Sequence, residues 1–407
     1  MSPPVSVKRA DRALTRSIAF LALAGFAAQS MVRVSDSLLP QIASDLSVTV
    51  GAASVVVTAY AFAHGSVQLV IGPVGDRFGK YICMASAAAV ASVLTFLCGL
   101  AQSLPALVAA RLACGLSAGW IVPLALAFIG DVIPYERRQA VIGRFLSGQI
   151  LGQLFGQAAG GVLGDLFGWR RVFFLLAGMF AVATIALFVE WARNPLTHAA
   201  SALPGRSHGF VAGYSAVLGS RFARLIILFG FLEAGLLFGS FTYVGADLHL
   251  RFGVGFALVG LFVGFFAIGG LIYSLSVVML VRKLGQTGLI TLGGAMLLLA
   301  YTSLALEPIW WLTPLSIVGI GLGFYMLHNT LQTNATQMTP QARGTAVAVF
   351  SSALYLGQTA GVSLAALVFD RHGGVPVFVA AGVLLLALAL WFRRELLARE
   401  AEQRSTV

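Results

Sequence analysis

Twelve apolar stretches, most of them about 20 residues long and separated by short polar intervals, account for most of this 407-residue chain. Each is long enough to cross the hydrocarbon core of a bilayer as an α-helix. The stretches are 17–39, 52–71, 81–101, 104–130, 139–164, 172–192, 222–246, 254–281, 289–306, 309–332, 345–369 and 375–392. Charged residues make up only 10% of the chain, against about 25% in a soluble protein. The sequence therefore predicts an integral membrane protein and excludes a soluble enzyme.

The basic residues are distributed asymmetrically between the polar intervals. Of the 26 Lys and Arg residues, 20 fall in the two tails and in alternate loops, and four fall in the other loops, namely Arg170, Arg171, Arg251 and Arg371. Because basic loops are retained in the cytoplasm, both termini are expected there. The net charge of +11 thus reflects topology and contact with anionic lipid, and it does not indicate nucleic acid. A cleaved signal peptide over residues 1–30 is the alternative for the first stretch, but it would break the alternation.

The second half of the sequence repeats landmarks of the first half. A shift of 206 residues aligns 77–80 with 283–286, and aligns Pro134, Arg137 and Ala140 with Pro340, Arg343 and Ala346. A shift of 205 aligns Gly152, Gly156, Asp165, Gly168, Val172 and Phe173 with Gly357, Gly361, Asp370, Gly373, Val377 and Phe378. Chance similarity of apolar segments is the alternative. The repeat predicts an all-α membrane protein of two six-helix bundles, related by an axis along the membrane normal, that rock about a central site.

A polar interval rich in Pro, Gly and Ser divides the two halves. It covers 193–221 and is expected to be a cytoplasmic linker between a bundle at 1–192 and a bundle with a short tail at 222–407. Cys83, Cys98 and Cys114 lie in apolar stretches, without the spacing of a disulfide framework or a zinc site. No metal is therefore expected.

The loop between the second and third stretches reads GPVGDRFGK over residues 72–80. Glycines allow a tight turn, and a carboxylate here can bind a helix N-terminus or an arginine across an interface. The loop resembles the cytoplasmic signature of the major facilitator superfamily, although Tyr81 stands where a second basic residue usually follows. The resemblance implies a cytoplasmic gate formed by Gly72, Gly75, Asp76, Arg77, Gly79 and Lys80. An ordinary basic turn is the alternative.

Arg111 lies within the fourth stretch, where a permanent cation costs about 3 kcal/mol to insert. It should therefore face a polar cavity or a partner. The surrounding sequence, LVAARLACG over 107–115, resembles a second motif of the superfamily, whose arginine influences the protonation of a neighbouring carboxylate in proton-coupled relatives. The alternative is a structural arginine that joins two helices through hydrogen bonds.

Glycines recur at four-residue spacing in the fifth stretch, at Gly148, Gly152, Gly156, Gly160 and Gly164, next to Gly161. Such a stripe lies along one helix face and lets a neighbouring backbone approach closely. In the superfamily's antiporters the corresponding motif reads Gly-Pro-x-x-Gly-Gly, and here Gln157 replaces the proline. The resemblance implies an antiporter, whereas this departure leaves the direction of transport open. Gln149, Gln153 and Gln157 form a parallel polar stripe that either lines a cavity or bonds between helices.

Two carboxylates are expected inside the membrane. In the first stretch, Gln29, Arg33 and Asp36 share a helix face, and the pattern from Asp36 to Pro40 resembles the first span of drug:proton antiporters. Low-dielectric surroundings favour the protonated carboxyl while the adjacent arginine opposes protonation, a competition that a proton-coupling site needs. A self-neutralising pair is the alternative. Glu233, without a basic neighbour in sequence, should be protonated or lie in water, as a second proton or cation site.

Further polar side chains recur at helical spacing in the second, tenth and eleventh stretches. They are Tyr60, His64 and Gln68 in the second, Tyr325, His328, Asn329 and Gln332 in the tenth, and Tyr355 and Gln358 in the eleventh. Each one alone is more typical of bonding between helices. Together they predict a polar cavity near the midplane between the bundles, lined also by Gln29, Gln149 and Gln153.

These features resemble the twelve-span drug:proton antiporter branch of the superfamily most closely. The resemblance implies a monomeric secondary transporter of the inner membrane, with lipid, protons and a small solute as partners and the proton gradient in place of a cofactor. Protons would enter at Asp36 or Glu233 and drive the export of an amphipathic compound. The alternatives are a symporter or uniporter for a small metabolite, and a membrane sensor built on the same scaffold.

Overall fold

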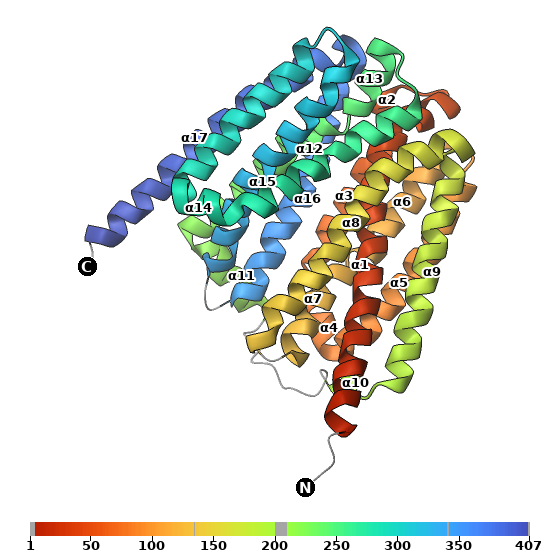
Figure 1. Cartoon of the computed structure of the whole chain (residues 1–407), viewed down its shortest axis with the longest axis vertical. Helices are drawn as coiled ribbons and strands as arrows, with labels where there is room; N and C mark the ends of the chain where they lie inside the picture. Colours follow the sequence, from red (N-terminus) through yellow and green to blue (C-terminus); the bar gives the residue numbers. More distant parts are fainter. Residues whose placement is uncertain (1–4, 134, 200–209, 340–341, 406–407) are drawn as a thin grey trace.

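A computed structural model of the protein describes residues 5–133, 135–199, 210–339 and 342–405. The first half of the described chain consists of α-helices that run alternately up and down (Figure 1). They are α1 (Val5–Asp45), α2 (Val50–Ala53), α3 (Val55–Gln68), α4 (Ile71–Phe78), α5 (Lys80–Leu100), α6 (Leu104–Ala118), α7 (Ile121–Val132), α8 (Tyr135–Phe167) and α9 (Trp169–Arg193).

The second half is also helical in its described part. Two short helices, α10 (Leu196–Ala199) and α11 (Phe210–Gly219), flank residues 200–209 of the expected linker, which lie outside the described residues. The helices that follow are α12 (Arg221–Phe241), α13 (Val244–Phe252), α14 (Phe256–Leu306), the 3-10 turn η1 (Trp310–Leu312), α15 (Thr313–Gln337), α16 (Arg343–His372) and α17 (Gly374–Ser405).

Ten helical segments of the described chain are long and apolar enough to cross a membrane. One of them, α14, has 51 residues and contains both the eighth and the ninth expected spans, which are joined at Gly285 with φ of 62°. The helix α8 corresponds to the expected fifth span. It is not among these ten segments because its polar stripe makes it less apolar. Counting α14 as two helices and including α8 gives the twelve spans that the sequence predicts.

Three expected spans contain short breaks in their helices, although each still provides one segment long and apolar enough to cross a membrane. The second divides into α2, α3 and α4, the fourth into α6 and α7, and the seventh into α12 and α13. Pro123 explains the break in the fourth span, because its missing N–H would have bonded the carbonyl of Gly119. That carbonyl instead accepts a hydrogen bond of 3.4 Å from the Gln68 side chain.

The sequence repeat is reproduced in the packing. Added Cβ atoms at Gly152 and Gly156 of α8 would lie 2.3 and 2.4 Å from the carbonyl oxygens of Phe26 and Ser30 of α1. In the second half, added Cβ atoms at Gly357 and Gly361 of α16 would lie 2.0 and 1.9 Å from the carbonyl oxygens of Phe231 and Gly235 of α12. All four pairs obey the same shift of 205 residues, so α1–α8 and α12–α16 are equivalent helix pairs of two related bundles.

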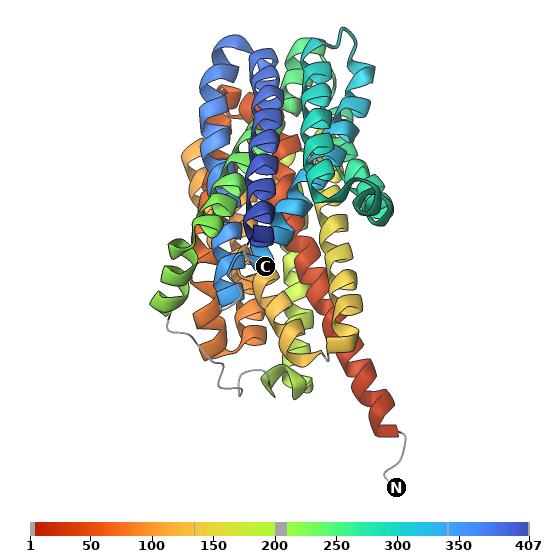
Figure 2. The same ribbon diagram turned by 90° about the vertical axis from the view of Figure 1, so that its left-hand side faces the viewer.

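The two bundles contact each other along α3 and α16, where an added Cβ at Gly65 would lie 3.1 Å from the carbonyl oxygen of Ser352, whereas α8 and α14 meet at one end of the molecule. We call this end, which carries α2 and α13, the far face, and the opposite end, which carries α4, α7 and α10, the terminal face (Figures 1 and 2). The far halves of α8 and α14 touch at Gly161 and Gly260. Toward the terminal face the same helices carry exposed apolar side chains, such as Leu151 and Leu275, and the second bundle leans away from the first (Figure 1). The contact between bundles is therefore closed at the far face.

Candidate transport site

Asp36 and Arg33 lie where α1 contacts the second bundle. Both are buried, and Nη1 of Arg33 lies 3.5 Å from Oδ2 of Asp36. The hydroxyl of Thr242, between α12 and α13, donates a hydrogen bond of 3.4 Å to the other carboxylate oxygen, while the Arg33 guanidinium lies 3.7 Å from the ring centre of Phe238. Pro40 lacks the N–H that would bond the Asp36 carbonyl. The structure thus places this ion pair between the bundles.

Glu233 of α12 has a partner that the sequence did not indicate. Its side chain is completely buried, and its Oε2 lies 2.8 Å from Nδ1 of His328 on α15. The ring of His328 stacks on Phe324, with centroids 4.7 Å apart. Oε1 of Glu233 has no hydrogen-bond partner within the described part of the chain. Glu233 and His328, predicted separately as a proton site and as a cavity residue, therefore form one pair in which the acid is buried and the histidine is partly exposed.

Arg111 is fully buried and is held by backbone carbonyl groups. Its Nε donates to Val56 at 3.2 Å and its Nη1 donates to Met31 at 3.0 Å, while its guanidinium lies 4.2 Å from the ring centre of Tyr60. These contacts tie α6 to α1 and α3. No ion pair joins Arg111 to a carboxylate in the described residues, where its Nη2 also has no hydrogen-bond partner. These contacts fit an arginine that joins helices, and its effect on a carboxylate stays a prediction.

His64 of α3 packs across the interface between the bundles. Its ring lies 4.2 Å from that of Tyr355 on α16 and 5.6 Å from that of Tyr60. Among the described residues, no hydrogen-bond partner exists for Nδ1 of His64 or for the hydroxyl of Tyr60, although both side chains are buried. Ordered water or a polar ligand normally satisfies such groups.

The predicted glutamine stripe of α8 divides into different environments. The side chain of Gln29 donates a hydrogen bond of 3.1 Å to Gln149, which joins α1 to α8 within the first bundle. Gln153 is half-buried. Gln157 is completely buried, and neither its amide oxygen nor its nitrogen has a partner in the described chain. Gln157, which stands where the antiporter motif has proline, thus has polar atoms that are available to water or a ligand.

The remaining predicted cavity residues lie in the second bundle. The side-chain nitrogen of Asn329 donates a hydrogen bond of 2.8 Å to the hydroxyl of Tyr273, whose ring stacks with that of Tyr325. Gln358 is buried on α16, whereas Gln332 is exposed near the terminal end of α15. The sequence did not single out Tyr273, because an isolated tyrosine in an apolar span carries no signal of its own.

The loop at 72–80 lies at the terminal face and does not bridge the bundles as expected. Oδ1 of Asp76 lies 2.8 Å from Nζ of Lys80, which also lies 2.6 Å from Oδ2 of Asp131 at the end of α7. Arg77 stacks loosely on Phe78. An added Cβ at Gly75 would lie 2.4 Å from Leu124, and Gly79 has φ of 97°. Gly72 is exposed. The loop therefore packs on α7 of its own bundle, and among the described residues it forms no ion pair with the second bundle.

A closure between the bundles exists instead at the far face. Asp370, near the end of α16, accepts hydrogen bonds from the Thr49 hydroxyl at 2.6 Å and from the Gly51 backbone N–H at 2.8 Å. The Thr359 hydroxyl donates to the Thr58 carbonyl at 3.5 Å along the same helix pair. In the sequence, Asp370 was marked only by its match with Asp165 in the repeat. Its partner at Thr49 carried no motif.

Glu307, just beyond the end of α14 at the far face, lies in a cluster of charged side chains outside the spans. The Thr313 hydroxyl donates a hydrogen bond to it. Arg251 contacts Glu307 at 3.8 Å and Asp247 at 3.1 Å. Burial raises the pKa of Glu307 from 4.5 to about 7, against the opposing hydrogen bond from Thr313 and the charge of Arg251.

The raised pKa of Glu307 predicts a pH-dependent stability. A carboxyl that holds its proton more tightly in the fold stabilises the fold fully below about pH 4.5 and loses this contribution as the pH rises to about 7. Between pH 5 and pH 8 the melting temperature of the wild type should fall by several degrees more than that of Glu307→Gln. Asp165→Asn, at an exposed carboxylate on the same face, serves as the control. An equal slope for Glu307→Gln and the wild type would contradict the assignment.

Two helical bundles with buried ionisable groups at their interface define the chain as a multi-pass membrane transporter. It belongs to the Major Facilitator Superfamily, whose family model matches residues 21–342. The MFS-type transporter YceJ of Bacillus subtilis, itself uncharacterised, is 26% identical over 360 residues, covering 87% of this chain and 90% of the relative. YwfA of the same organism, also an uncharacterised MFS-type transporter, is 27% identical over 382 residues, covering 91% and 90%.

Solved structures show the same fold at low sequence identity. The nucleoside transporter NupG superposes with a TM-score of 0.72 at 13% identity, over 92% of this chain and 98% of that protein. A bacterial homologue of the lysosomal transporter Spinster, in an inward-facing and unoccupied conformation, gives 0.72 at 17% identity, over 94% and 96%. The all-α fold predicted from the repeat is confirmed, and these similarities establish the fold alone.

Proposed function

We propose that this protein is a proton-coupled secondary transporter that exports small amphipathic organic compounds from the cytoplasm. The positive-inside distribution of basic residues supports placing the terminal face in the cytoplasm. In that orientation the far face is the external face, and the structure corresponds to a state closed to the outside.

The observation that carries the proposal is the contact of Asp36 with both bundles. Its carboxylate pairs with Arg33 on its own helix and accepts a hydrogen bond from Thr242 of the second bundle. Protonation would change the charge at a contact that exists when the far face is closed. A proton at Asp36 and the arrangement of the bundles can therefore bias each other, which is the requirement for coupling.

The chemistry near the acidic groups supports an amphipathic solute. Aromatic rings lie next to the ionisable side chains, with Phe238 under Arg33 and Phe324 under His328. Polar atoms of Gln157 and Glu233 remain available for hydrogen bonds. Such a surface suits a compound that has an apolar body and a few polar groups.

Flux in proteoliposomes under an imposed pH gradient, measured over a panel of compounds, tests the proposal. The wild type should move substrate against the proton flow. Asp36→Asn should lose gradient-driven flux by about tenfold or more, the scale of a coupling free energy of 1–3 kcal/mol, while keeping exchange of labelled for unlabelled substrate. Glu233→Gln should weaken the same driven flux, and Asp165→Asn, an exposed carboxylate at the end of α8, should match the wild type.

The direction and the gradient dependence of the flux separate the alternatives. Substrate that enters together with protons would replace export by symport of a metabolite. Flux that does not depend on the pH gradient in the wild type, Asp36→Asn and Glu233→Gln would refute proton coupling and indicate a uniporter. No flux of any compound, with binding retained, would favour a sensor.

A further inference from the structure

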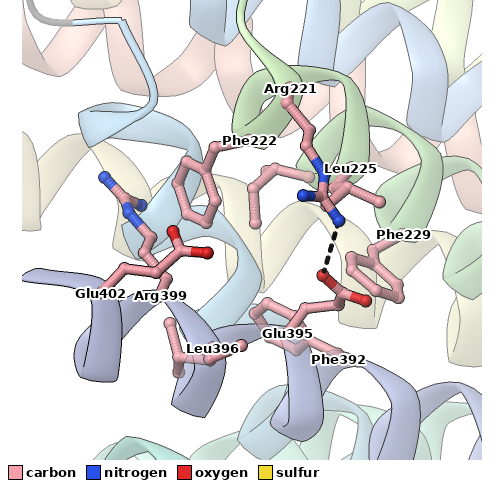
Figure 3. Close-up of a pocket in the computed structure, with 11 residues that line it drawn as sticks. Arg221, Phe222, Leu225, Phe229, Phe392, Glu395, Leu396, Arg399 and Glu402 are labelled. Atoms are coloured by element: carbon pink, nitrogen blue, oxygen red, sulfur yellow. Dashed lines mark ion pairs between the residues drawn. The ribbon is translucent and has the colours of Figure 1, made fainter.

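A cavity of about 200 Å³ lies outside the candidate transport site, between the beginning of α12 and the end of α17 (Figure 3). Every lining residue comes from these two helices of the second bundle. The cavity is lined by Arg221, Phe222, Leu225, Ile226, Phe229, Phe392, Glu395, Leu396, Ala398, Arg399 and Glu402. None of them takes part in the contacts between the bundles described above, so this cavity is distinct from the transport pathway.

The cavity combines an apolar floor with a charged rim. Phe222 and Leu225 supply partly exposed apolar surface, Phe229 and Phe392 are buried, and Figure 3 shows arginine and glutamate side chains around them. Arg221 is largely exposed, and its guanidinium reaches Glu395 only at 4.0 Å. Such a long, exposed contact adds little stability, so Arg221 is available to another anion. The guanidinium of Arg399 lies 3.4 Å from the ring centre of Phe222, which fixes a second cation at the rim.

The position of α17 places the cavity at the depth of lipid headgroups. Its apolar run ends at Phe392 and is followed by two exposed arginines, Arg393 and Arg394. Trp391 is partly exposed, and its ring N–H donates to Glu395 at 3.3 Å. Tryptophans of this kind mark the boundary between the hydrocarbon core and the headgroups. The apolar residues of the cavity therefore lie at the depth where the acyl chains join the headgroups, and the charged rim lies beside the phosphates.

We propose that this cavity binds an anionic phospholipid with a hydroxyl-bearing headgroup, of the phosphatidylglycerol type. The phosphate would lie between Arg221 and Arg399, which offer forked donors suited to phosphate oxygens. Glu395 lies at the same rim as an acceptor for headgroup hydroxyls, and the part of the acyl chain nearest the headgroup packs on Phe222 and Leu225. The cavity is too small for a folded partner, and its location at the bilayer surface favours lipid over a soluble anion.

Native mass spectrometry of the full-length protein in detergent tests the site, with phosphatidylglycerol, phosphatidylcholine and inorganic phosphate as separate probes. The wild type should bind phosphatidylglycerol about five to ten times more tightly than phosphatidylcholine, as expected for one or two charged hydrogen bonds. Arg221→Gln should remove most of this preference. Arg224→Gln, on the same helix and outside the cavity lining, removes the same charge and should keep the preference.

A second variant tests the cavity without changing any charge. Ala398→Trp fills the space and should weaken phosphatidylglycerol binding by about five- to tenfold, as Arg221→Gln does. The melting temperature without lipid checks that Ala398→Trp and Arg221→Gln both fold. An equal loss of the phosphatidylglycerol preference in Arg221→Gln and Arg224→Gln would show that surface charge in general, and not this cavity, causes the preference. Equal binding of phosphatidylcholine, full competition by inorganic phosphate, or a second copy of the chain seated there would each overturn the proposal.

Discussion

Gly361→Val is expected to cause the largest loss of stability of any substitution considered for this protein. An added Cβ at Gly361 would lie 1.9 Å from the carbonyl oxygen and 2.5 Å from the carbonyl carbon of Gly235. Both are backbone atoms of α12, so no side-chain rotation can relieve the overlap. The helices α12 and α16 would have to separate along their whole contact, at a cost of about 3 kcal/mol or more.

The expected result is a strongly reduced yield of monodisperse protein and a melting temperature several degrees lower, measured by size-exclusion chromatography and thermal unfolding. Gly344→Val is the matched control, since it lies on the same helix and an added Cβ there meets no atom within 4 Å. Gly152→Val in the first bundle should behave like Gly361→Val because the two glycines occupy equivalent helix pairs. Normal stability of Gly361→Val would show that the close packing of α12 on α16 is wrong.

The architecture was predictable from the sequence because its signals repeat. Apolar length predicted the spans, and the shift of 205 residues paired Gly152 and Gly156 with Gly357 and Gly361 before any contact was known. The structure confirms that these glycines pack on equivalent backbones. What the sequence could not give is where a span breaks, since the interruption at Gly119 depends on Pro123 and on a side chain from another helix.

The candidate site was predictable as a set of residues and not as a set of pairs. Asp36 and Glu233 were found because a charge inside an apolar span is conspicuous. The pairing of Glu233 with His328 joins residues 95 positions apart, and Thr242 reaches Asp36 from the other bundle. Such neighbours depend on helix tilt and rotation, which short motifs do not encode. The loop around Asp76 matched its motif, but its contacts depend on which end of the molecule is closed.

Next to the glycine stripe of α8 lies a glycine that has a different role from the stripe itself. Gly152 and Gly156 pack against α1 of their own bundle, whereas an added Cβ at Gly161 would lie 2.3 Å from Cα of Gly260 on α14. Gly161 therefore belongs to the contact between the bundles at the far face. Gly161 lies outside the four-residue spacing, so the sequence already set it apart from Gly160, but the spacing could not identify α14 as its partner.

Gly161→Val is accordingly expected to abolish transport while leaving the fold intact. The bulk would penalise closure of the far face by about 1–3 kcal/mol, which shifts the ratio of closed to open states by roughly 5- to 150-fold. Each bundle keeps its own packing, so the melting temperature should change little. Gly260→Val should reproduce the effect from the other side, and Gly143→Val, on α8 with no atom within 4 Å of an added Cβ, should act like the wild type.

Spin labels at the exposed far-face positions Ser44 and Arg371 report the change directly, in a background where Cys83, Cys98 and Cys114 are alanine. The distance distribution should move from short to long in Gly161→Val and remain short in Gly143→Val. Loss of transport with an unchanged distribution would assign Gly161 to substrate binding instead of closure. A large drop in melting temperature would place it with Gly361 among the residues that hold a bundle together, because only a contact between bundles can be lost without unfolding either one.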